Sequence, residues 1–221
     1  MTDYSKYYDL ETYIFEDVHR RFHAEHSLGA FDLFSIVIWK ANRAKSKIAL
    51  KLLAQDPEGR RDLEAIARTL TASLYEASSH KERLRILMKD WKFALPMASS
   101  ILSVCYPEDF TIYDYRVREL IGGFPNLNNL ADFEKIWAGY NEYKARVSQL
   151  APAERTFRDR DRYLYGKSKA LQLEADIRRL FQTESPAPDQ AQMRGYASSP
   201  QTPEEVNEWA AEQVWDNYES E

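Results

Sequence analysis

The residues best suited to chemistry lie in one short stretch near the middle of the chain. A run of small and apolar residues, Leu95–Leu102, is followed after a break by the segment Ile112–Arg118. There the carboxylate of Asp114 follows apolar residues and has arginines within one helical turn. Such a carboxylate can stabilise a cation that forms as a bond breaks. Aspartate is also a favoured helix N-cap residue, so a purely structural role for Asp114 stays open.

A second group of candidates is basic. Lys40, Arg43, Lys47 and Lys51 are spaced by three, four and four residues, so one continuous helix would carry them as a single stripe. Asp32 and Asp56 are the nearest acidic residues on either side of it. A stripe of this kind can neutralise nucleic-acid phosphates, and it can equally be the solvated face of an ordinary helix.

Another basic cluster spans 155–169. It contains four arginines interleaved with Asp159 and Asp161 between Arg155 and Tyr163. Because opposite charges this close along a helix can pair locally, we expect structural salt bridges here in preference to nucleic-acid contacts.

The elements that position these residues are predicted to be helices. The chain has only 7 glycines in 221 residues, and apolar residues recur at helical spacing in almost every segment. The fold class is therefore predicted to be all-α, with the first and last helices close together. Gly29 is expected to end the first helix, and 31–55 is read as a buried helix followed by an amphipathic one. The expected helices are 7–26, 31–55, 63–74, 84–91, 97–105, 114–121, 133–147 and 157–181.

The composition changes after Gln182. Residues 183–221 carry a formal charge of −8, whereas residues 1–182 carry +3. We expect 1–182 to form a helical domain, 183–202 a flexible linker rich in Pro, Ser and Gln, and 203–221 an acidic tail. Within that tail, 203–218 is predicted to be a docking helix, which binds either the basic stripe or a separate protein through Trp209; a solvated tail without a docking role stays open.

Several classes of protein are excluded by composition. No apolar run approaches the length of a membrane span, and the N-terminus does not resemble a secretory signal, so a cytoplasmic protein without membrane contact is expected. The single cysteine, Cys105, cannot form an intramolecular disulfide or a four-cysteine metal site. His19 and His23 lie four residues apart, which suits a metal or a solvated or capping role. We expect no metal and no cofactor.

Two stretches resemble the helix-hairpin-helix DNA glycosylase superfamily, whose members share an endonuclease III-like fold. Read without gaps, Ala98–Val117 is similar to the segment in which a Thr-Ala-x-x-Ile-Leu helix leads to a Val-Asp-x-x-Val motif, and the family's aspartate falls on Asp114. Phe31–Asn42 resembles the family's Phe-Glu-Leu-Leu…Leu-Ser-x-Gln segment. Asn42 then falls on the position of the side chain that fills the hole left by a flipped base.

The resemblance implies a base-excision enzyme that binds duplex DNA and extrudes a base into a pocket. Asp114 would stabilise the sugar cation or activate water, and Trp39 or Tyr115 would stack on the flipped base. The nucleic-acid contacts would come from the basic stripe together with Lys92, Arg116 and Arg118. The alternative is a glycosylase-like scaffold without catalysis that binds nucleic acid or a protein partner.

The chain also departs from the family. Lyase-competent members have a lysine eighteen residues before the aspartate, where this chain has Pro96. A monofunctional mechanism without an imine intermediate is therefore expected, unless Lys92 or Lys40 reaches the site by another route. The family's Leu-Pro-Gly-x-Gly hairpin falls on Asp90–Ala94, which contains neither glycine. DNA binding through backbone amides of this hairpin is correspondingly weakened.

Overall fold

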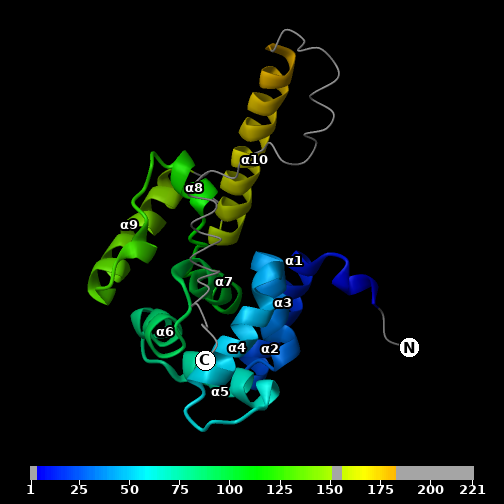
Figure 1. Cartoon of the computed structure of the whole chain (residues 1–221), viewed down its shortest axis with the longest axis vertical. Coiled ribbons are helices and arrows are strands. Elements are labelled where there is room, and N and C mark those ends of the chain that lie inside the picture. The colour runs from blue at the N-terminus through cyan, green and yellow to red at the C-terminus, as the bar shows by residue number, and fades with distance from the viewer. Residues whose placement is uncertain (1–3, 151–155, 183–221) are drawn as a thin grey trace, which may run out of the picture.

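The computed structural model describes residues 4–150 and 156–182 (Figure 1). Across these ranges the regular secondary structure is helical and includes no strand, which confirms the all-α prediction for this part of the chain. No helix within it is long and apolar enough to cross a membrane. The predicted linker at 183–202 and the tail at 203–221 lie outside the described residues, as does Arg155.

The N-terminal helix runs without a break from Leu10 to Glu25, after a 3₁₀ turn at Ser5–Tyr7. It consists of α1 (Leu10–Thr12), a π-helical segment (Tyr13–Val18) and α2 (His19–Glu25). It ends at His26, which takes a left-handed conformation with φ 57°. The prediction that Gly29 ends this helix is therefore wrong. Gly29 instead has an extended conformation and is the N-cap residue of the next helix.

The segment 30–55 forms two helices, α3 (Ala30–Ala41) and α4 (Lys45–Gln55), joined by a 3₁₀ turn (Asn42–Ala44). The chain leaves α3 at Ala41, where φ is −155° and ψ is 77°. Lys40 thus belongs to α3, whereas Lys47 and Lys51 belong to α4. The basic stripe therefore does not follow one continuous helix.

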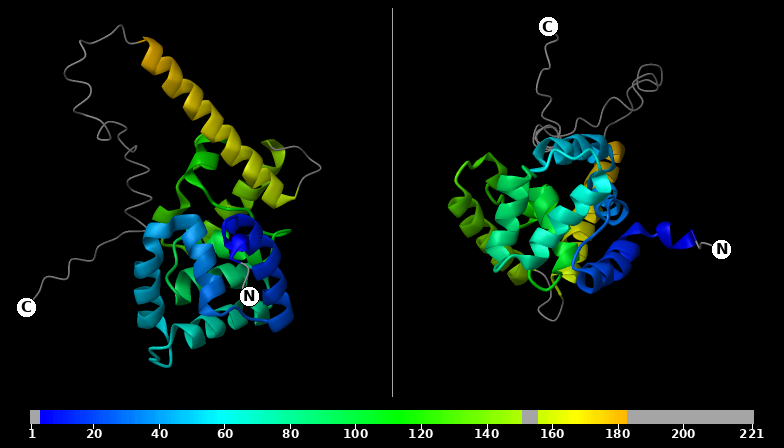
Figure 2. Two further views of the ribbon diagram at one scale, coloured as in Figure 1. Left: turned by 90° about the vertical axis from the view of Figure 1, so that its right-hand side faces the viewer. Right: turned by 90° about the horizontal axis from the view of Figure 1, so that it is seen from below.

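The remaining helices lie close to the predicted ranges. Figures 1 and 2 show α10 packed near α8 and α9 at its start, with its C-terminal half extending away from the body. The elements are α5 (Leu63–Glu76), α6 (His80–Arg85) continued by a π-helical segment (Ile86–Asp90), α7 (Leu95–Cys105), α8 (Tyr115–Leu120), a 3₁₀ turn (Leu127–Asn129), α9 (Phe133–Leu150) and α10 (Phe157–Gln182).

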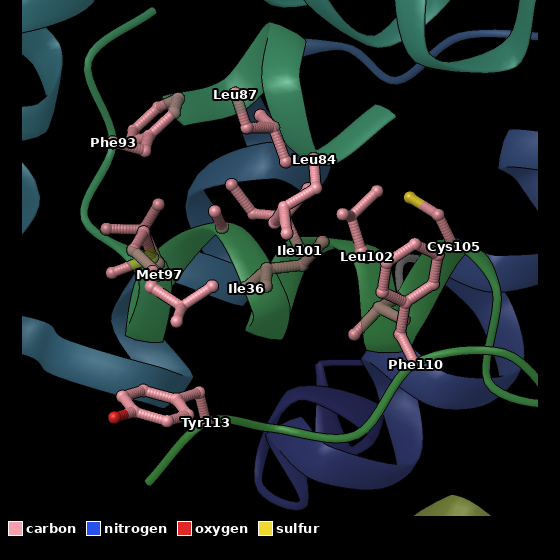
Figure 3. Close-up of a cluster of buried hydrophobic side chains, with 14 of the residues drawn as sticks. Ile36, Leu84, Leu87, Phe93, Met97, Ile101, Leu102, Cys105, Phe110 and Tyr113 are labelled. Carbon is pink, nitrogen blue, oxygen red and sulfur yellow. The ribbon is translucent and has the colours of Figure 1, made fainter. Parts of the chain in front are cut away.

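Helix α7 is the centre of the core, because every one of its 11 residues is buried. Small and apolar side chains make this possible, since they allow other helices to approach from several sides. Figure 3 shows Ile101 and Leu102 of α7 among Ile36 of α3, Leu84 of α6 and Leu87. Phe110 and Tyr113, from the segment that follows α7, belong to the same buried cluster.

The histidines His19 and His23 bind the C-terminal end of α7. Nδ1 of His19 lies 2.9 Å from the carbonyl oxygen of Val104, and Nε2 of His23 lies 2.8 Å from that of Cys105. These carbonyls lack partners within the helix, so the two imidazoles act as caps. Among the described residues, no group of three or more His, Cys, Asp or Glu side chains is arranged to hold a metal.

Candidate functional site

A cavity of about 220 Å³ lies where α3, the segment entering α8, the N-terminal helix and the start of α10 meet. Its wall combines three acidic, three basic and three aromatic side chains with two aliphatic ones. The lining residues are Glu11, Phe15, Trp39, Lys40, Ile112, Asp114, Val117, Arg158, Asp161, Arg162 and Tyr165.

An ion pair between Lys40 and Asp114 lies in this wall. Nζ of Lys40 is 2.7 Å from Oδ2 of Asp114, and their side chains are only 15% and 13% exposed. The other carboxylate oxygen, Oδ1, accepts a hydrogen bond from the backbone N–H of Arg116 at 2.9 Å. Asp114 therefore caps α8 and faces the cavity at the same time, so the two roles suggested by the sequence coexist in one side chain.

The charge of Asp114 is set by competing effects. Burial alone would raise the pKa of this carboxyl. The Lys40 ammonium and the N–H of Arg116 favour the ionised form, and together they bring the pKa of Asp114 below its ordinary value. The carboxylate is therefore negative at neutral pH although water scarcely reaches it.

Two tyrosines of α9 hold the extended segment that leads to Asp114. The hydroxyl of Tyr140 donates to the carbonyl of Thr111 at 2.6 Å and accepts from its N–H at 3.2 Å. The hydroxyl of Tyr143 donates to the carbonyl of Ile112 at 2.9 Å and accepts from the N–H of Asp114 at 3.4 Å. Both tyrosines are fully buried. The backbone of the site is thus fixed by side chains that sequence reasoning did not single out.

Asp161 supplies a second carboxylate to the cavity. We predicted that Asp161 pairs with neighbouring arginines. In the structure it is instead buried, with only 7% of the residue exposed. Its Oδ2 accepts from the N–H of Ile112 at 2.9 Å, and its Oδ1 accepts from the hydroxyl of Thr111. Burial raises the pKa of Asp161 to about 7, although these two hydrogen bonds favour ionisation. The site therefore contains two carboxyl groups with separated pKa values, an arrangement suited to acid–base chemistry.

Charged side chains also line the cavity between the N-terminal helix and α10. Oε1 of Glu11 lies 3.2 Å from Nε of Arg162 and 3.8 Å from Nη2 of Arg158. The guanidinium of Arg158 packs over the ring of Phe15, 4.4 Å from its centroid. The ring of Phe15 in turn makes an edge contact with Trp39. These contacts confirm that the first and last described helices meet.

Some predicted site residues lie elsewhere. Asn42 is exposed, and its side-chain oxygen accepts from Nζ of Lys45 at 3.2 Å. Neither Asn42 nor Tyr115 is among the residues that line the cavity. The guanidinium of Arg116 instead lies over the ring of Tyr115, with its Cζ 4.9 Å from the ring centroid. Of the three residues that the resemblance implies for a flipped base, Trp39 is the one that lines the cavity.

The predicted nucleic-acid contacts have different environments. Arg43 is exposed, and Arg116 donates to the side chain of Gln172 at 2.5 Å. Arg118, in contrast, is 6% exposed, with its guanidinium over Tyr113. A phosphate cannot reach a buried side chain without unfolding its surroundings, so the prediction of a surface contact at Arg118 is wrong.

The remaining basic residues belong to α4 and the connection before α7. Nζ of Lys47 is buried, and Nζ of Lys51 donates to the carbonyl of Lys92 at 2.8 Å. Lys92 has an exposed side chain and a left-handed backbone with φ 57°. The hydrogen bond from Lys51 to Lys92 joins α4 to the connection that precedes α7.

Comparison with known protein families, curated proteins and solved structures finds no match for this chain.

Proposed function

We propose that this chain is a DNA-binding protein of the base-excision type, with monofunctional N-glycosylase-like activity on a flipped base. The observation that carries the proposal is the Asp114 carboxylate, which is ionised in the cavity wall beside Lys40. Cleavage of an N-glycosidic bond builds positive charge on the sugar, and a negative charge fixed beside the sugar stabilises it. Asp114 would perform this step.

The aromatic side chains of the cavity support a planar ligand. Trp39, Phe15 and Tyr165 all line it, and flipped bases are commonly read by stacking on such rings. Carboxylates and guanidinium groups beside them offer hydrogen-bond acceptors and donors to the base edge. The partner we propose is duplex DNA, approached across α3, the turn at 42–44 and α4, where Arg43 is exposed.

The helix pair formed by α6 with its π-helical extension and by α7 also supports the proposal. A short connection, 91–94, joins the two helices. Lys92 in this connection takes the left-handed conformation that glycine adopts most easily. The position is the one where the resemblance places the first hairpin glycine, so a hairpin-like backbone is kept without that residue. The finer assignment, a helix-hairpin-helix glycosylase-like fold, rests on this point and on the two similar stretches of sequence.

A second candidate is a non-catalytic module of the same architecture that binds nucleic acid or protein. It is favoured by the start of α7, where the N–H of Leu95 is bonded to the side chain of Asn128 at 3.1 Å. The next residue, Pro96, has no N–H to offer. The hairpin thus presents fewer amides to a phosphate than a glycine-containing hairpin would.

Base release from a panel of duplexes that contain deaminated, oxidised or alkylated bases separates these candidates. The wild-type protein is expected to release one class of base, and Asp114→Asn is expected to lose this release. Because Asp114→Asn also removes the partner of Lys40, the double variant Lys40→Met/Asp114→Asn serves as a folding control. Folded protein that retains full base release in either Asp114 variant would refute the catalytic role. Absence of release across the panel, with duplex binding retained, would favour the non-catalytic module.

A further inference from the structure

We propose that the C-terminal half of α10 is an interaction surface that pairs, antiparallel, with the same segment of a second copy of this chain. Figures 1 and 2 show this half extending away from the body. The resulting homodimer goes beyond the proposed function and does not depend on it, because none of the residues that carry the inference lines the cavity.

An apolar stripe follows one face of this half of the helix. It consists of Gly166, Ala170, Leu173, Ile177 and Leu180, which are separated by alternating four and three residues, the spacing of a coiled-coil seam. Leu173, Ile177 and Leu180 are 61%, 44% and 72% exposed. A partner that covers the stripe removes this apolar surface from water, which favours association.

The stripe lies on the side of α10 that faces away from the body. Asp161 and Leu164 are buried against the body, and Gln172 accepts a hydrogen bond from Arg116 of α8 at 2.5 Å. At about 100° per residue these three α10 residues share one face, and the stripe falls on nearly the opposite one. A Cβ atom added at Gly166 would meet nothing within 4 Å. A second helix can therefore approach the stripe closely.

The sizes of the stripe residues favour an antiparallel pair. When two copies run in opposite directions about a centre between positions 171 and 172, Gly166 faces Ile177 of the second copy. In the next layer, Ala170 faces Leu173 of the second copy. Each small residue then leaves room for a large one, so both layers pack closely. In a parallel pair each small residue would instead face its own counterpart, which leaves gaps along the seam.

The charges beside the stripe are self-complementary in the same orientation. Lys167 and Glu174 lie along one edge of the stripe, and Lys169 and Asp176 lie along the other. Antiparallel copies place each lysine beside the acidic residue of the same edge, and symmetry repeats each pair. Both acidic residues also pair with an arginine of their own helix. Since exposed ion pairs add little affinity, these charges serve mainly to fix the orientation.

A second copy fits this face better than the acidic tail of the same chain does. The tail segment 203–218 has five acidic residues and no basic residue, whereas the edges of the stripe carry two of each sign. The tail would therefore meet like charge at Glu174 and Asp176. A face that pairs with itself about a two-fold axis closes at a dimer. Because α10 is already folded, association does not have to form the helix.

The test is the oligomeric state of the full-length protein, measured by sedimentation equilibrium from about 1 to 100 μM. We expect a monomer–dimer equilibrium in the micromolar range. Leu173→Glu should weaken the dimer at least about 100-fold, since it buries an unpaired charge in each copy. Leu171→Glu is the matched control, because Leu171 is 47% exposed and lies off the stripe. It should leave the dimer unchanged.

Charge reversal tests the orientation. Lys167→Glu places two acidic residues side by side in the antiparallel dimer and should weaken it. The double variant Lys167→Glu/Glu174→Lys restores opposite charges at both positions and should recover the wild-type dissociation constant. A double variant as weak as Lys167→Glu would overturn the antiparallel arrangement.

Three outcomes of the sedimentation measurements would overturn the inference as a whole. They are a wild-type monomer at every concentration, a dimer that Leu173→Glu leaves intact, and equal weakening by Leu171→Glu and Leu173→Glu. A full-length monomer that becomes dimeric only on truncation after Gln182 would also overturn the choice of a second copy, and would assign the stripe to the acidic tail.

Discussion

The Asp161 carboxylate accepts a hydrogen bond from the backbone N–H of Ile112 at 2.9 Å. This bond ties the start of α10 to the segment that enters α8, two residues before Asp114. The same carboxylate therefore positions the site backbone and lines the cavity. Burial opposes its ionisation, so the folded protein holds a proton there that the unfolded chain releases at a lower pH.

The first prediction concerns the pH dependence of stability. The pKa of Asp161 rises from 3.8 to about 7 on folding, because burial disfavours the charged form. Between these values the folded state binds more protons at this site, so its contribution makes the free energy of unfolding fall as pH rises and level off above the folded pKa. Urea unfolding across this range is expected to show a shallower decline for Asp161→Asn. Parallel curves for the variant and the wild type would contradict the prediction.

A second prediction concerns the buried hydroxyl of Tyr140. Tyr140→Phe leaves the buried N–H and carbonyl of Thr111 without this partner, so the free energy of unfolding should fall by about 1–3 kcal/mol. Chemical denaturation at neutral pH measures the change. Tyr8→Phe is the control, because Tyr8 is 98% exposed. Equal stabilities for the two variants would argue against a role for Tyr140 in holding the segment that leads to Asp114.

A third prediction concerns the ion pair. Lys40→Met leaves the Asp114 charge in the cavity wall without its ammonium partner, so we expect the free energy of unfolding to fall by about 3 kcal/mol. Adding Asp114→Asn removes that charge and should recover much of the loss, since asparagine still caps α8. A double-mutant cycle from thermal or urea unfolding gives the coupling energy. Additive single effects would show that the two groups are not coupled.

A fourth prediction tests the acidic tail. Residues 183–221 carry −8 against a body of +3, so self-docking on the basic residues of the body would compete with nucleic acid. Truncation after Gln182 is expected to raise affinity for duplex DNA most at low ionic strength, since salt screens the attraction. Fluorescence anisotropy over a salt series measures this. Unchanged affinity at every salt concentration would eliminate autoinhibition, with docking to a separate protein and a solvated tail both still open.

The helices could be predicted from the sequence because apolar spacing and turn residues are local signals. Trp39 and Asp114 could be selected from motif similarity and Lys40 from the basic stripe, and the structure places all three in one cavity wall. Asp161 could not be selected in this way. Alternating Arg and Asp residues are typical of a solvated helix face, and the burial of Asp161 depends on its contacts with Thr111 and Ile112 in a distant segment.

Arg118 was also misjudged from the sequence, which suggested a phosphate contact for a side chain that the structure buries. A basic residue one turn after Asp114 suggests a phosphate contact. Its burial arises because α8 turns it over the ring of Tyr113 and toward the carbonyl of Phe124. Such contacts depend on the path of the chain through Gly122 and Gly123, both of which have positive φ. Local sequence patterns carry no information about them.

The central claim is that this cavity receives a flipped nucleotide, and abasic-site binding measures it most directly. The wild-type protein is expected to bind a duplex with a tetrahydrofuran abasic analogue at least about tenfold tighter than the intact duplex, or ~1.4 kcal/mol. Tyr165→Ala should reduce that preference, because Tyr165 lines the cavity. Tyr163→Ala is the control, because Tyr163 is 42% exposed and Tyr165 is 43% exposed, but Tyr163 is not among the residues that line the cavity. Equal wild-type affinity for both duplexes would contradict the account.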